Sequence, residues 1–202
     1  TLIDTNSTYI DKNVKIGRDT IIYPNCHIKG NSVIGEDCII RENTTIEDSH
    51  IEDHVTIKSS TILSSKVGAR TTIGPYAYLR PKSVLGEDVK IGDFVEVKNA
   101  EIGNGSKASH LSYIGDAVVG KNVNIGCGVV FVNYDGKNKF KSIVEDNAFI
   151  GSNSNLVAPV TVKEGGYIAT GSTVTMDVKE GKKRVARTRE EIKENRRNKK
   201  RI

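Results

Sequence analysis

Aliphatic residues recur along this chain at a spacing that neither an amphipathic helix nor an alternating strand produces. They occupy every sixth position from Ile10 to Ile46 and continue in steps of six or five to Ile102. After a less regular stretch the series resumes at Ile114 and runs to Val174. Six residues make one short strand and a corner, and three such repeats make a triangular coil with the aliphatic residues inside. The pattern therefore predicts an all-β chain, folded as a parallel β-helix of hexapeptide repeats.

The composition and the corner positions agree with this prediction. Hydrophobic residues make up 37% of the chain, with no Trp and one Met, which favours short strands over helices. Cys26 and Cys38 stand four residues after an aliphatic position, where other repeats carry Ser or Thr. We expect both to be small, inert core groups, and about nine coils to stack on one another because no single coil buries its own core.

The series is interrupted between Phe131 and Val144, which are thirteen residues apart. About seven residues within 132–143 must leave the coil, so a projecting loop is predicted there. The segment 133–141 contains a turn signal and three lysines, which suit it to cover an anionic ligand. The alternative is a surface insertion without a function.

A second irregularity lies just upstream, in segment 105–115. Ala108 takes the aliphatic position there, and His110 follows it. An imidazole with an ordinary pKa of ~6.5 accepts a proton near neutrality, so His110 is the candidate general base. The other histidines lie in regular coils and are predicted to be corner residues: His27, His50 and His54.

The charge is unevenly distributed. The formal net charge is +5, but residues 179–202 hold twelve Lys or Arg and four Glu, which leaves the rest of the chain at −3. We expect a β-helix domain over 1–178, with the loop 132–143 inserted, and a short basic tail over 179–202. No aromatic residue alternates with these charges, so nucleic acid is not the expected partner.

Three cysteines without metal-ligand spacing leave one unpaired in any disulfide scheme, which favours a reducing cytoplasm. No apolar run approaches the ~20 residues that cross a bilayer, and no signal peptide is evident, so membrane insertion is not expected. The chain begins at Thr1 directly within the repeats. We therefore expect it to be part of a longer polypeptide.

Several segments together resemble one known family. They are YLRP at 78–81, DFVEVK at 93–98, GSKASHLSYIG at 105–115, NVNIG at 122–126 and NYDGKNKFK at 133–141. They resemble the C-terminal acetyltransferase domain of the bacterial bifunctional N-acetylglucosamine-1-phosphate uridyltransferases. The resemblance implies a left-handed β-helix and a homotrimer with shared active sites. It also implies acetyl transfer from acetyl-CoA to glucosamine 1-phosphate, for UDP-N-acetylglucosamine and cell-wall synthesis.

The same resemblance assigns roles to individual residues. His110 is implied as the general base. The implied ligands of the sugar phosphate are Arg80, Lys98, Tyr113, Asn124 and Lys139. The implied contacts of acetyl-CoA are Cys127, Asn133, Tyr134, Ser152, Thr170 and Arg187. The family commonly has Ala where this chain has Cys127 and Thr170, so backbone contacts are expected at these two positions.

No metal is expected for acetyl transfer. The resemblance assigns Mg²⁺ to the uridylyltransferase half, and this chain has no Gly-rich nucleotide loop. Three rival functions remain open at this point. They are a hexapeptide-repeat acyltransferase with another acceptor, a trimeric zinc carbonic anhydrase that would need three His ligands, and a noncatalytic β-helix that only drives oligomerisation.

Overall fold

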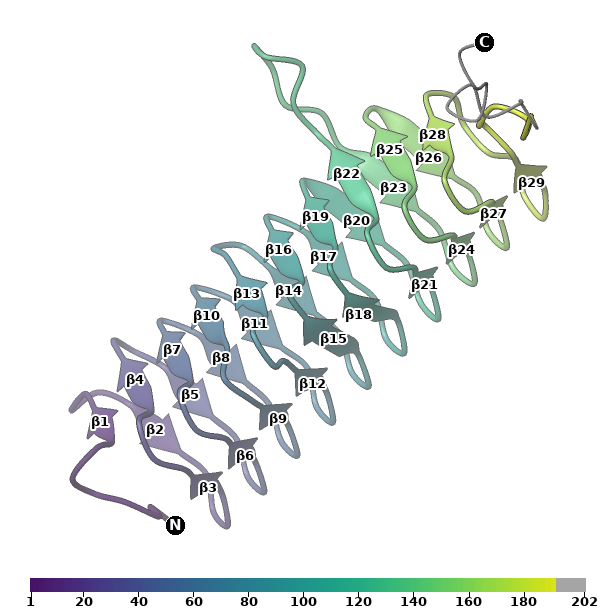
Figure 1. Ribbon diagram of the computed structural model, residues 1–202. Coiled ribbons are helices and arrows are strands. Elements are labelled where there is room, and N and C mark those ends of the chain that lie inside the picture. The colour runs from purple at the N-terminus through teal and green to yellow at the C-terminus, as the bar shows by residue number, and fades with distance from the viewer. Residues whose placement is uncertain (192–202) are drawn as a thin grey trace, which may run out of the picture.

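A computed structural model describes residues 1–191 of the chain. Within these residues, short strands form three parallel sheets of ten, nine and ten strands. Successive strands along the chain enter successive sheets, so the sheets are the three faces of a prism, and the coils stack along its axis (Figure 1). The predicted parallel β-helix is confirmed.

The first sheet contains β1 (Tyr9–Ile10), β4 (His27–Lys29), β7 (Thr45–Glu47), β10 (Thr61–Leu63), β13 (Tyr78–Leu79), β16 (Glu96–Lys98), β19 (Tyr113–Gly115), β22 (Val130–Val132), β25 (Asn155–Val157) and β28 (Thr173–Val174). The second contains β2 (Lys15–Ile16), β5 (Val33–Ile34), β8 (His50–Ile51), β11 (Lys66–Val67), β14 (Val84–Leu85), β17 (Glu101–Ile102), β20 (Ala117–Val119), β23 (Ser142–Val144) and β26 (Val160–Val162). The third contains β3 (Ile21–Ile22), β6 (Ile39–Ile40), β9 (Thr56–Ile57), β12 (Thr72–Ile73), β15 (Lys90–Asp93), β18 (Lys107–His110), β21 (Asn124–Ile125), β24 (Phe149–Ile150), β27 (Tyr167–Ile168) and β29 (Lys183–Arg184).

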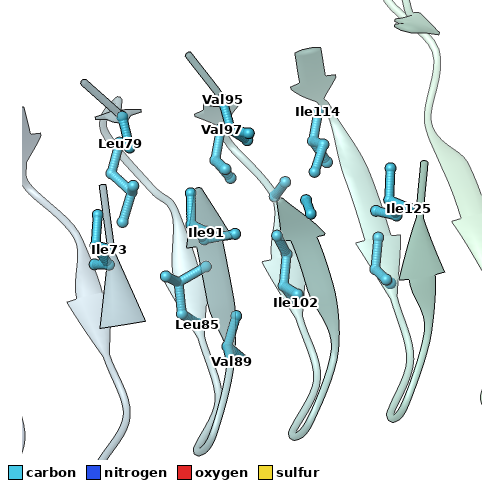
Figure 2. Packing of buried hydrophobic residues seen from close by; sticks show 14 of the residues in the cluster. Ile73, Leu79, Leu85, Val89, Ile91, Val95, Val97, Ile102, Ile114 and Ile125 are labelled. Carbon is cyan, nitrogen blue, oxygen red and sulfur yellow. The ribbon is translucent and has the colours of Figure 1, made fainter. Parts of the chain in front are cut away.

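The core is a stack of aliphatic side chains in strict register. Leu79 pairs with Val97, which pairs with Ile114 on the next coil, and all three are fully buried. Figure 2 shows these residues and their neighbours filling the space inside the coils. Burial of one such side chain stabilises the fold by ~1.5–3 kcal/mol. Ile10 and Ile16 remain 37% and 38% exposed, because among the described residues only the following coil covers them.

Cys26 and Cys38 are confirmed as core groups. Both are fully buried, and burial raises the pKa of each thiol above its ordinary value. A thiol that stays protonated is a poor nucleophile and a poor metal ligand. These two cysteines therefore contribute packing rather than chemistry.

A projecting loop is present within the predicted bounds 132–143, and it holds nine residues, 133–141, where about seven were expected. Val132 pairs with Val157, and Ser142 and Ile143 belong to β23, so only residues 133–141 leave the coil. The loop extends outward from the prism between β22 and β23 (Figure 1). Its two arms are joined by an antiparallel bridge between Tyr134 and Lys139.

The β-helix continues past residue 178, where we expected the basic tail to begin. Lys183 and Arg184 form β29 and pair with Tyr167 and Ile168 of β27. The first part of the predicted tail 179–202 therefore extends the third sheet. Residues 192–202 lie outside the described range. Nowhere in residues 1–191 is there a helix long and apolar enough to cross a membrane.

Candidate active site

The candidate base lies at the corner where the third sheet leads into the first. Asp93 ends β15 and His110 ends β18, and the two strands pair so that these residues are opposite each other on adjacent coils. The His110 Nδ1 atom is 2.6 Å from the Asp93 Oδ1 atom. The hydrogen bond to His110 is the main reason that the pKa of Asp93 lies below its ordinary value. Sequence reasoning did not single out Asp93.

Three of the residues predicted to contact acetyl-CoA continue the same corner. Cys127, Ser152 and Thr170 each follow an inward aliphatic residue by two positions, as His110 follows Ala108. At one coil per ~4.8 Å, Thr170 lies about 14 Å along the axis from His110. On the following coil, Arg187 lies opposite Gly171, one residue beyond the position equivalent to Thr170, and its Cδ atom is close to Gly171. The corner thus presents a straight row that starts at the candidate base.

Close backbone stacking along this row requires glycine beside it. A Cβ atom added to Gly151 would lie 2.5 Å from the Thr170 backbone nitrogen, closer than real side chains approach. The backbone of Ser152 in turn accepts a hydrogen bond from Gly171, with 2.9 Å between N and O. The row is therefore held by main-chain contacts between coils.

A second group of predicted residues meets at the next corner, where the first sheet leads into the second. Arg80 follows β13, Lys98 ends β16, and Lys139 reaches back from the projecting loop. They line a surface hollow of about 430 Å³ together with Pro81, Lys82, Asn99 and Asp116. Arg80 is paired with Glu96 at 2.9 Å. The ammonium of Lys98 is the main cause that holds the pKa of Lys139 below its ordinary value. Asp116 offsets only part of this repulsion, so the hollow favours binding of an anion.

The Tyr113 hydroxyl lies beside this cationic hollow, because the tyrosine ring folds along β19 toward Gly115. The ring lies over Gly115, where a side chain would overlap with the tyrosine hydroxyl. Gly115 pairs with Lys98, so the hydroxyl is brought to the corner that carries the lysines. A glycine at position 115 is what permits this path.

Asp116 joins the projecting loop to the body of the β-helix. Its carboxylate accepts hydrogen bonds from the Asn99 and Asn133 side-chain amides, each at 2.5 Å, and its backbone oxygen accepts one from Ser142 at 3.2 Å. Burial favours the neutral acid, but the two amides and the charges of Lys98 and Lys139 outweigh burial and lower the pKa of Asp116. Both ends of the loop are thus fixed by one ionised residue that sequence reasoning missed.

The structure places two predicted acetyl-CoA residues at the loop. Asn133 is 7% exposed, and its amide also approaches the Tyr113 hydroxyl at 3.3 Å. Tyr134 is 54% exposed, and its hydroxyl donates to the backbone oxygen of Gly136 at 2.6 Å. Within one chain, Asn133 is therefore grouped with the sugar-phosphate residues rather than with Ser152 and Thr170.

Asn124 is separated from the other predicted sugar-phosphate ligands. It lies in β21 on the outer face of the third sheet, between Lys107 and Phe149. Arg80 and Lys98 belong to the far edge of the first sheet. A single chain does not bring Asn124 to the cationic hollow.

An apolar ridge runs beside His110. On three successive coils, the position after the one equivalent to His110 carries a large apolar residue. These residues are Tyr76, Phe94 and Leu111, which are 61%, 58% and 57% exposed. All three have left-handed backbone angles, with φ of 59°, 55° and 46°. The next coil has Gly128 at this position, the residue that such a conformation ordinarily favours. Large apolar residues held there leave a hydrophobic surface next to the candidate base.

The part of the chain that the structure describes contains no group of three or more His, Cys, Asp or Glu side chains arranged to hold a metal. His27, His50 and His54 lie on coils other than that of His110. Three histidine ligands for zinc, which the carbonic anhydrase reading would need, are not gathered within residues 1–191 of one chain.

Comparison with solved structures identifies the fold. The fold matches the UDP-N-acetylglucosamine acyltransferase of Arabidopsis with a TM-score of 0.66 at 16% identity, over 91% of this chain and 71% of that chain. It matches the acyltransferase of the same name from Campylobacter jejuni with a TM-score of 0.54 at 16% identity, over 89% and 69%. A family model described as the EIF2B subunit epsilon LbH domain matches residues 2–97. The fold is the left-handed parallel β-helix that we predicted.

Sequence comparison is more specific. The chain is 72% identical to the bifunctional protein GlmU of Clostridioides difficile (strain 630) over 194 residues, which are 96% of this chain and 42% of that protein. It is 66% identical to the bifunctional protein GlmU of Alkaliphilus oremlandii over 96% of this chain and 43% of that protein. Over almost its whole length the chain is similar to one part of the bifunctional protein GlmU, and the predicted resemblance to this family is confirmed. It spans about two fifths of the length of these relatives.

Proposed function

We propose that the chain transfers acetyl from acetyl-CoA to the amine of glucosamine 1-phosphate, and that the product supplies UDP-N-acetylglucosamine for the cell wall. The similarity to GlmU supports this acceptor. The observation that carries the proposal is the pairing of two sites on one short stretch of the prism. A row that starts at His110 lies on one corner, and a hollow with Arg80, Lys98 and Lys139 lies on the next.

The binding roles follow from charge and position. Arg80, Lys98 and Lys139 hold the phosphate, since fixed cations bind it through charge-assisted hydrogen bonds. Tyr113 orients the sugar beside them. Acetyl-CoA lies along the row of Cys127, Ser152 and Thr170, with Arg187 at its far end. Tyr134 contributes from the projecting loop.

The reaction needs one base and no metal. His110 takes a proton from the sugar amine as its nitrogen bonds to the thioester carbonyl carbon. The C–S bond then breaks, and the departing thiolate takes up one proton to leave as CoA. A substrate ammonium enters with three protons. One stays on the amide, one ends on CoA, and one leaves through His110 to solvent. Backbone N–H groups of the corner support the transient oxyanion.

The proposal includes a homotrimer with shared sites in the cytoplasm. Two features support the trimer. Asn124 is remote from the cationic hollow of its own chain, and the ridge of Tyr76, Phe94 and Leu111 is exposed beside His110. The free state of all three cysteines fits a reducing compartment. Uridylyl transfer and its Mg²⁺ are assigned to the part of the GlmU relatives that this chain does not span.

Release of free CoA with different acceptors tests the proposed function. The chain is supplied with acetyl-CoA and, in parallel, with glucosamine 1-phosphate, glucosamine or serine, and the thiol is measured with a chromogenic reagent. We expect the sugar phosphate to give the highest kcat/KM, because only it engages the cationic hollow. Equal or higher values with glucosamine or serine would assign the chain to another acceptor.

A further inference from the structure

The contact between Asp93 and His110 is built into the coil register. Asp93 and His110 are the last residues of paired strands, and the Leu111 backbone N–H donates to the Asp93 backbone oxygen at 2.9 Å. The side chains meet at 2.6 Å although they are seventeen residues apart in the sequence. Neither side chain depends on a mobile loop for its position.

The chemistry of the two groups fixes where the shared proton lies. An ionised carboxylate only accepts hydrogen bonds, so the proton in this contact belongs to the His110 Nδ1 atom. The lowered pKa of Asp93 keeps its carboxyl ionised at neutral pH. A neutral imidazole carries one ring proton. The His110 Nε2 atom then holds the free lone pair.

No other side chain within the described residues takes this role. Along the row, the neighbour of His110 on the opposite side is Cys127, which is a weak acceptor. Among residues 1–191, Asp93 is the one hydrogen-bond partner recorded for the His110 ring. His110 itself is largely exposed, with 58% of its side chain accessible. Without Asp93, water would compete for both ring nitrogens.

We propose that Asp93 is a positioning residue that holds the His110 ring in the Nδ1–H tautomer, so that Nε2 is the atom that accepts the proton of the sugar amine. The inference rests on His110 being the base of the proposed function. Its analogue in general enzymology is the carboxylate that orients a catalytic histidine without itself taking the proton.

The tautomer is measured directly by ¹⁵N NMR of the intact chain labelled at histidine. At about pH 8.5, in the alkaline range where neutral imidazole is observed, we expect the His110 Nδ1 signal to be of the protonated type. In Asp93→Ala the signal should shift toward the Nε2–H form. In Asp93→Asn the side-chain amide can either accept through its oxygen or donate through its NH2 group, so we expect a mixture of the two tautomers. Persistence of the Nδ1–H form in both variants would overturn the proposal.

Kinetics supply the second arm of the test. Loss of a side chain that orients a metal-bound histidine costs roughly 10–100-fold, and we take this as the scale for Asp93. We therefore expect Asp93→Ala to lower kcat by about that factor with KM for both substrates within about threefold, and Asp93→Glu to recover part of kcat. A normal kcat in Asp93→Ala would refute the role of Asp93 while leaving His110 as base. A fully active His110→Ala would instead refute the proposed base, and the NMR result would still report the tautomer.

Discussion

Replacing Lys98 by methionine isolates the charge of one residue in the cationic hollow, because the apolar stem is kept. Two effects follow. The phosphate loses one charge-assisted hydrogen bond, and Lys139 loses the neighbour that lowers its pKa. The first effect weakens binding of glucosamine 1-phosphate. The second keeps Lys139 protonated to higher pH.

The loss of one hydrogen bond to a charged group is worth ~1.5–3 kcal/mol, which corresponds to about a 10–150-fold rise in Kd. The pH dependence of the affinity is a second effect, and its direction can be predicted. In the unmodified chain Lys139 is charged below its lowered pKa, so affinity falls as pH rises through that pKa. A phosphate monoester with a second pKa of about 6 stays dianionic over this range. In Lys98→Met the fall in affinity should therefore begin at higher pH.

Isothermal titration calorimetry with glucosamine 1-phosphate and with acetyl-CoA, from neutral to alkaline pH, measures both effects. Lys15→Met is the matched control, because Lys15 is an exposed lysine of β2, several coils away from the hollow along the second sheet. Acetyl-CoA affinity should be unchanged in both variants. The reasoning fails if Lys98→Met weakens the binding of both ligands equally. It also fails if the affinity of Lys98→Met for glucosamine 1-phosphate begins to fall at lower pH than that of the unmodified chain.

Three further predictions address the base, the ridge and the exposed thiol. His110→Ala should lower kcat by ~10²–10⁴-fold in the CoA-release assay. His54→Ala removes an equally exposed histidine 3.8 Å from Asp37 and should leave kcat unchanged, so equal losses in the two variants would contradict the role of His110 as base. Tyr76→Asp should abolish the trimer in analytical ultracentrifugation together with activity, because a charge enters the apolar ridge, while Tyr9→Asp, at a similarly exposed tyrosine, should keep both. Cys127→Ala should retain activity and alkylation of Cys127 should inhibit, with protection by acetyl-CoA; trapping of an acetylated Cys127 by mass spectrometry would require a two-step route.

The fold was predictable because a β-helix repeats one local rule. Every coil needs an inward aliphatic residue at a fixed spacing, so even the substitution of Ala108 was recognised as an occupied core position, and it is buried. The projecting loop was recognised for the same reason, as a gap in the series. Its bounds were less accurate because Val132 and Ile143 still pair with adjacent coils, which a spacing argument does not show.

The partners of the candidate site could not be read from spacing. Asp93 meets His110 across one coil, and Asp116 meets Asn133 across another, in both cases seventeen residues apart. Coil length varies with each five-residue step, so a sequence does not show which corner residues coincide. The direction of the Asn133 amide depends on how the loop folds back on Asp116. Resemblance to a family grouped Asn124 with Arg80, although one chain holds them on different faces.

The central claim is that an amine nitrogen of a sugar phosphate attacks the acetyl group of acetyl-CoA. The most direct measurement uses acetyl-CoA labelled with ¹³C at the acetyl carbonyl and glucosamine 1-phosphate labelled with ¹⁵N, followed by NMR of the products. We predict a one-bond ¹³C–¹⁵N coupling that grows with enzyme and time and is nearly lost in His110→Ala. Label found only in free acetate, or in an ester on a sugar oxygen without coupling to ¹⁵N, would contradict the account.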